Sequence, residues 1–190
     1  MRSPGSTLAS QSGDYTMKTL AATIAIILLT GSVALGQWKK DGKTIEDAPN
    51  RKSLGEFGGQ LLVVRDPRKF IEDWQKPETP KIDDVNTVQR GELYGAIVLF
   101  AGCKAGTQGR CNSEIDYAFY RPDGSLYEAQ KAQPLWKDEP LPSPNIQLGR
   151  AILVIRFEKA DPAGEYKIKA KVSDFNGGVS FELETSIRLQ

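Results

Sequence analysis

The residues best suited to chemistry in this sequence are its two cysteines, Cys103 and Cys111. They flank a Gly-rich segment, KAGTQGR, between two runs that look like strands. Strands joined in this way bring cysteine Cα atoms near bonding range, so we predict one disulfide at the open end of a hairpin. Closing a loop of about nine residues stabilises the fold by roughly 2.5 kcal/mol in the chain-entropy model.

A pair of free or redox-active thiols is the alternative to this crosslink. The spacing is not C-x-x-C, and the chain contains no histidine that could lower a thiol pKa. Histidine is also the commonest general base and metal ligand in proteins. A phosphate-binding G-x-x-x-x-G-K-[ST] motif does not occur. We therefore expect a non-enzymatic protein with no catalytic residue, no metal ligands and no cofactor.

Acidic side chains occur in groups that could suggest other chemistry. The groups are Asp83–Asp84, Asp138–Glu139 and the set Glu114, Asp116 and Asp123. A glycosidase needs two carboxyls across a cleft, and calcium needs several hard oxygen ligands. No D-x-D-x-D-G run is present, and no spacing shows two carboxyls converging. We predict solvated acids, with a polysaccharide hydrolase as the open alternative.

Two exposed features are candidates for binding. The loop from Lys104 to Arg110 is small, polar and basic, and it is either a rigid recognition loop or simply a tied-off turn. Trp136 lies in a proline-rich segment, residues 133–145, that we expect to be a long exposed loop. Tryptophan is enriched at binding hot spots, which makes Trp136 a binding candidate. The other reading, which the sequence favours, is that it folds back to cover the end of the sandwich.

The charge of the chain is balanced. It has 25 Lys and Arg against 24 Asp and Glu, and removing Arg2, Lys18 and Asp14 of the leader leaves 23 of each. Such a chain has no long-range field that would attract nucleic acid or an anionic membrane surface. The expected partner is an unknown protein or an envelope component, and not a nucleic acid.

Residues 1–36 have the form of an upstream segment followed by a signal peptide, with Met17 as the start. Lys18 provides a positive charge, Leu20 to Leu29 an apolar run, and Ala34–Gly36 a cleavage site. An uncleaved membrane anchor is the alternative, but the apolar stretch is shorter than the roughly 20 residues needed to span a bilayer. We predict a periplasmic or extracellular protein with no stable membrane insertion after cleavage, and export suits a disulfide.

The remaining chain reads mostly as strands. Residues 37–59 are polar and Gly-rich, which predicts a flexible arm. Asp66 and Pro67 can start a short helix. Residues 166–172 and 179–189 alternate apolar and polar, with lysines on one strand facing glutamates on the next. Asn176–Gly177 between them predicts a type I′ hairpin turn.

The segment from Asp161 to Tyr166 resembles the tyrosine corner that begins strand F of immunoglobulin-like domains. Together with the Pro122–Ser125 turn and the final hairpin, it is similar to bacterial immunoglobulin-like and macroglobulin-like domains. The resemblance covers roughly residues 94–190 and implies a sandwich of about seven or eight strands. We predict an all-β, immunoglobulin-like antiparallel sandwich of about 7–8 strands over residues 60–190, with one short helix and long loops. It implies no functional residue.

These observations favour an exported, non-enzymatic binding or interaction module of the cell envelope. A periplasmic inhibitor or chaperone-like factor that uses the disulfide-closed loop is the second hypothesis. The polysaccharide hydrolase is the third.

Overall fold

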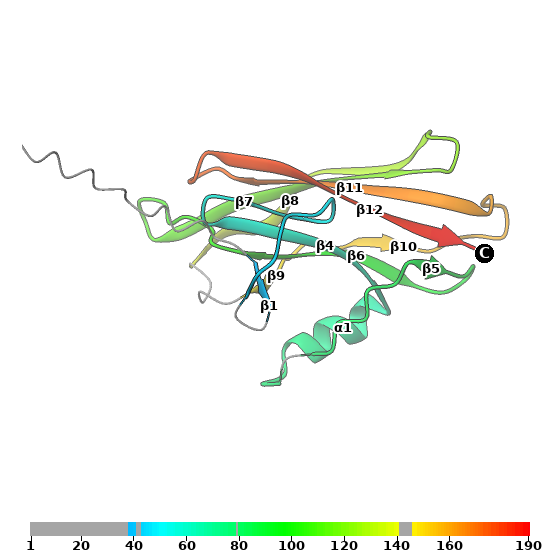
Figure 1. Cartoon of the computed structure of the whole chain (residues 1–190), viewed down its shortest axis with the longest axis horizontal. Coiled ribbons are helices and arrows are strands. Elements are labelled where there is room, and N and C mark those ends of the chain that lie inside the picture. Colours follow the sequence, from blue (N-terminus) through cyan, green and yellow to red (C-terminus); the bar gives the residue numbers. More distant parts are fainter. Residues whose placement is uncertain (1–37, 41–42, 79, 141–145) are drawn as a thin grey trace, which may run out of the picture. The chain divides into compact units, whose positions relative to one another are not determined.

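A computed structural model describes residues 38–40, 43–78, 80–140 and 146–190 of the chain. It is an all-β sandwich of two five-stranded sheets with one short helix (Figure 1). The first sheet has the order β10-β6-β4-β3, and β9 also pairs with β6. Its strands are β3 (Arg51–Leu54), β4 (Phe57–Arg65), β6 (Tyr94–Ala101), β9 (Gln147–Leu148) and β10 (Leu153–Ile155).

The second sheet has the order β5-β12-β11-β7-β8. Its strands are β5 (Thr87–Val88), β7 (Arg110–Tyr120), β8 (Leu126–Pro140), β11 (Gly164–Asp174) and β12 (Val179–Leu189). All strand pairs in both sheets are antiparallel except β5 with β12. A separate pair is formed by β1 (Lys39–Lys40) and β2 (Lys43–Thr44). β7, β11 and β12 are neighbours in the second sheet.

The core lies between the sheets and is filled by alternate residues of the period-2 strands. In β7 every second residue from Cys111 to Phe119 is buried, and β11 follows the same pattern. β6 is instead buried at every position from Tyr94 to Phe100. One of its faces points to the second sheet, and the other packs with Leu62 and the helix residue Phe70.

The helix α1 (Pro67–Trp74) begins where the sequence predicts. Asp66 is the N-cap, and its side chain accepts a hydrogen bond from the Lys69 amide at 3.2 Å. Pro67 takes the first helical position, where no amide hydrogen is needed. Phe70, the buried residue at the centre of the helix, joins α1 to the outer face of the first sheet.

The predicted ladder of lysines and glutamates is present on the outer face of the second sheet. Lys167 and Lys169 of β11 both pair with Glu184 of β12, at 2.8 and 3.6 Å. The hydrogen bond from Lys167 lowers the pKa of the Glu184 carboxyl. Cross-strand pairs of this kind contribute a few tenths of a kcal/mol each and help to fix the register.

The tyrosine corner is formed as its sequence predicts. The Tyr166 hydroxyl donates a hydrogen bond to the Pro162 carbonyl oxygen at 2.9 Å. The ring is fully buried and packs against Phe119 and Phe157, with centroid distances of 5.5 and 4.6 Å. Burial raises the pKa of the Tyr166 hydroxyl, which therefore stays a donor.

Part of the expected flexible arm over residues 37–59 is wrong, because β3 and the start of β4 fall within it. The glycines that suggest a loop lie inside β4. A Cβ on Gly59 would come within 3.2 Å of the Phe181 and Leu183 side chains of the opposite sheet. Glycine is used here for close approach of the two sheets and not for a turn. The expected domain boundary at residue 60 therefore lies inside a strand.

The prediction of a long loop over residues 133–145 is wrong for residues 133–140. Residues 133–140 continue β8, an edge strand with four register shifts against β7. Prolines 134 and 140 fit there because an edge strand leaves one side without ladder hydrogen bonds. Residues 141–145 lie outside the described part, as does the predicted leader over residues 1–36.

The turn between β11 and β12 also differs from its prediction. The strands end in the pair Asp174 and Val179, which leaves the four residues 175–178 in the loop. A type I′ turn requires positive φ at both central residues, but in this loop only Gly178 has it, at 65°. Asn176 has a different role, described below.

Removing the tyrosine-corner hydroxyl should destabilise the sandwich. We expect Tyr166→Phe to lower the free energy of unfolding by about 1 kcal/mol, because it deletes one buried hydrogen bond and leaves the Pro162 carbonyl unpaired. Chemical denaturation measures this change. Tyr120→Phe is the matched control, since Tyr120 is only half-buried at the end of β7. Equal stability of Tyr166→Phe and the wild type would contradict a structural role for the hydroxyl.

Candidate functional site

The predicted disulfide between Cys103 and Cys111 is confirmed, with a Cα–Cα distance of 6.0 Å. Its expected position in a hairpin is wrong. Cys103 follows β6 of the first sheet, and Cys111 is the second residue of β7 in the second sheet. β6 and β7 do not pair, so the disulfide ties one sheet to the other. Both cysteines are buried, with 8% and 0% exposure.

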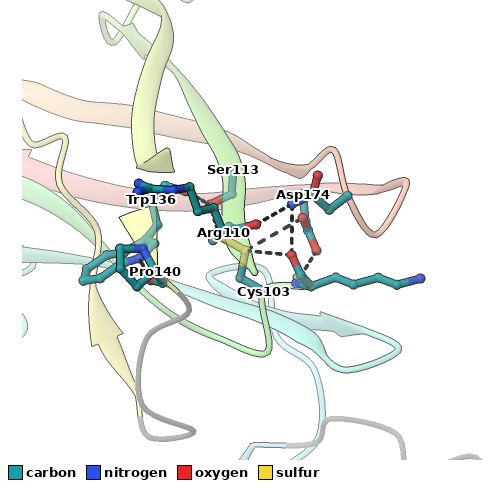
Figure 2. The surroundings of a disulfide bond; sticks show 9 residues. Cys103, Arg110, Ser113, Trp136, Pro140 and Asp174 are labelled. Atoms are coloured by element: carbon teal, nitrogen blue, oxygen red, sulfur yellow. Dashed lines mark hydrogen bonds between the residues drawn. A yellow bond between two sulfur atoms is a disulfide. The ribbon is translucent and has the colours of Figure 1, made fainter. Parts of the chain in front are cut away.

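Residues 103–111 are called the disulfide loop here, and residues 175–178 the hairpin loop. Figure 2 shows how the two meet around the sulfur atoms. Asp174, at the end of β11, accepts a hydrogen bond from the Lys104 amide at 2.9 Å. The Phe175 amide donates to the Asn112 carbonyl at 3.0 Å. Two segments some 70 residues apart in sequence therefore form one structural unit.

Asn176 is the second connection between these loops. Its side-chain amide nitrogen donates to the carbonyl oxygens of Lys104, at 3.1 Å, and Arg110, at 2.9 Å. These carbonyls belong to the first and last residues between the cysteines. One side chain thus holds both sides of the disulfide loop.

The disulfide loop also has internal hydrogen bonds. The Gly106 amide donates to the Arg110 carbonyl at 2.8 Å, and the Gly109 amide donates to the Gly106 carbonyl at 3.0 Å. Gly109 has a φ of 69°, which favours glycine. A Cβ on Gly106 would lie 3.1 Å from the Asn176 amide nitrogen, so the loop fits closely against this side chain.

Gly102 brings a third segment to the same end of the sandwich. It has a φ of 75°, and a Cβ there would lie 1.7 Å from the Glu56 carbonyl oxygen in the turn between β3 and β4. That turn therefore lies directly against the residue that precedes Cys103.

Of the predicted binding residues, Lys104 and Arg110 lie on the disulfide loop and are exposed. The Arg110 guanidinium donates to the Asp138 carbonyl of β8. The structure adds Phe175 of the hairpin loop, whose side chain is 55% exposed. A large apolar residue beside an Asn–Gly pair was the available signal, and the sequence analysis missed it.

Trp136 does not extend into solvent. It is half-buried and packs against Phe100, with a centroid distance of 5.8 Å. Its indole nitrogen donates to the Pro140 carbonyl at 2.9 Å, and the Arg150 guanidinium stacks 4.2 Å from its ring. This is the folded-back arrangement that the sequence favoured for Trp136.

Six of the seven grouped acids have a local partner for their carboxylate. Asp84 accepts from the Val63 amide, Asp116 from Ala132 and Asp123 from Ser125. The other three form ion pairs: Asp83 with Lys81, Glu114 with Lys137, and Glu139 with Arg150. Within the described ranges no three His, Cys, Asp or Glu side chains are grouped so as to hold a metal ion. These carboxylates have structural contacts and form no common site.

A groove lies elsewhere, beside β12. It has a volume of about 450 Å³ and is lined by residues 47–49 and by side chains of both charges, among them Lys52, Lys169 and Glu182. Its mixed charge does not select one ligand chemistry. In the described part of the chain no helix is long and apolar enough to cross a membrane.

Comparisons with known proteins identify no family. No family model matches the sequence, and no curated protein matches it. Among solved structures, a family 123 glycoside hydrolase from Clostridium perfringens is similar over 70% of this chain and 27% of its own, at 10% identity and a TM-score of 0.39. The alkylpurine DNA glycosylase AlkC of Pseudomonas fluorescens, bound to DNA with an abasic site analogue, is similar over 55% and 28%, at 17% identity and a TM-score of 0.32. This chain thus spans less than a third of either protein.

The contact at Gly102 can be tested against a matched glycine. Gly55 also has positive φ, at 64°, but a Cβ there would meet no atom within 4 Å. Alanine at either position strains the backbone similarly, so the difference between the two variants isolates the clash with Glu56. We expect Gly102→Ala to be less stable than Gly55→Ala by about 1–3 kcal/mol in chemical denaturation. Equal losses would show that the turn between β3 and β4 does not lie against Gly102.

Proposed function

We propose that the protein is an exported, non-enzymatic binding module that contacts its partner through the disulfide loop and the hairpin loop. One observation carries the proposal. The backbone of this surface is fixed by the disulfide, Asp174 and Asn176, while Lys104, Arg110 and Phe175 are exposed on it. A surface that is already ordered loses little conformational entropy on binding.

The position of these loops supports the same proposal. They connect β6 to β7 and β11 to β12, and in immunoglobulin-like domains the corresponding B–C and F–G connections form the recognition end of the sandwich. This is an analogy of fold, and it agrees with the exposure of the three side chains. Loops on a rigid scaffold are common binding surfaces.

Export is part of the proposal because of the disulfide. Disulfides persist mainly in oxidising compartments such as the periplasm and the extracellular space. The signal-peptide pattern of residues 17–36 supports the same location. The local pairing of the grouped acids argues against the hydrolase alternative.

The proposal can be tested with three variants of the oxidised protein. Pull-down from an envelope extract of the cells that produce it would identify a partner, and titration would then give the affinity of each variant. We expect the double substitution Lys104→Glu with Arg110→Glu, and separately Phe175→Ser, to weaken binding by about tenfold or more.

Val154→Ser is the matched control. Val154 is 50% exposed, close to the 55% of Phe175, but it lies on β10 in the first sheet. It should leave the affinity unchanged. A partner that binds all variants equally, or that only Val154→Ser weakens, would place the binding surface elsewhere.

A further inference from the structure

Asn176 is the one asparagine in this sequence that is followed by glycine. The pair matters chemically because the backbone nitrogen of the following residue can attack the asparagine side-chain amide. Glycine has no side chain to hinder that attack. The pair lies in the hairpin loop, where both residues are half-buried and within reach of water.

The structure restrains the Asn176 amide from two sides. Its nitrogen donates to the Lys104 and Arg110 carbonyls, at 3.1 and 2.9 Å. A Cβ on Gly106 would lie 3.1 to 3.3 Å from the amide nitrogen, oxygen and carbon, so the disulfide loop closes over the group. These contacts restrain the movement of the amide.

We infer that Asn176 is a site of spontaneous deamidation that the closed disulfide loop protects. A solvent base removes the Gly177 amide proton, and that nitrogen attacks the Asn176 side-chain carbon. The bond from this carbon to the amide nitrogen breaks, and the nitrogen leaves as ammonia after taking up a proton. Water then opens the resulting succinimide to aspartate or isoaspartate, and no oxidant or reductant takes part.

Deamidation would remove the hydrogen bonds that Asn176 donates to the disulfide loop. An aspartate carboxylate at position 176 has no hydrogen to donate and would face two carbonyl oxygens. It would also place a negative charge near Asp174, whose side chain is only 1% exposed. Deamidation should therefore remove the Asn176 connection between the two loops and leave the hydrogen bond from the Lys104 amide to Asp174 in place. The reaction should be irreversible.

The test measures the rate of this amide-to-acid conversion by mass spectrometry of the peptide that contains Asn176. The oxidised wild type is incubated at a fixed alkaline pH, both folded and unfolded in urea. The double variant Cys103→Ser with Cys111→Ser opens the loop, and Gly106→Ala displaces the amide while keeping the disulfide. Thr107→Ala, an exposed position in the same loop, is the matched control, and Asn86, followed by threonine, is an internal reference.

We expect Asn176 to deamidate about tenfold more slowly in the folded wild type than in urea, because two hydrogen bonds must break first. Gly106→Ala and the double serine variant should both be faster than Thr107→Ala. A folded wild type that deamidates as fast as the unfolded chain would overturn the inference. A Gly106→Ala variant whose Asn176 deamidates no faster than in Thr107→Ala would also overturn it. This comparison does not depend on whether the double serine variant folds. The readout needs no partner, so the result is separate from the proposed binding function.

Discussion

The hydrogen bond between the Asp174 carboxylate and the Lys104 amide is the contact on which the disulfide-loop end of this structure depends. Asp174 is buried, and a buried carboxylate is costly unless hydrogen bonds compensate for lost water. The hydrogen-bond donor comes from the disulfide loop, 70 residues away in sequence. If the disulfide loop moved away from the hairpin loop, the Asp174 carboxylate would either become exposed to water or stay buried without this hydrogen bond.

The disulfide acts together with this contact because of where its cysteines lie. It joins the end of β6 in one sheet to the start of β7 in the other, so it fixes the two layers at one end of the sandwich. The tyrosine corner fixes the start of β11, and β11 carries Asp174 at its far end. Rigid strands thus place the groups that hold the two loops, and the exposed side chains follow from that placement.

The sequence predicted those parts of the fold that have local signals. Alternating residues identified β7, β11 and β12, the Asp66–Pro67 pair located α1, and the cysteines were correctly paired. It could not predict that β6 and β7 belong to different sheets, because adjacent strands in sequence often pair and nothing local decides between the two arrangements. The start of β4 was predicted to be a loop because it contains glycines, and the second half of β8 because it contains prolines, since both residue types are typical of loops.

The candidate site was predicted only in part for the same reason. Lys104 and Arg110 were found because they are the first and last residues between the cysteines. Asn176 was interpreted as a turn residue, because its contacts with the Lys104 and Arg110 carbonyls depend on how two distant loops meet. Phe175 was missed although it lies beside the Asn–Gly pair, and the structure shows that it is 55% exposed.

Hydrogen exchange at the Lys104 amide in the oxidised protein tests the central claim most directly. If the disulfide loop and the hairpin loop are one rigid unit, this amide exchanges far more slowly than an unstructured peptide, although it lies in an exposed loop. Its protection should then fall in Asp174→Ala while amides in the middle of β11 stay protected. Exchange of the Lys104 amide at the rate of an unstructured peptide in the wild type would contradict the account.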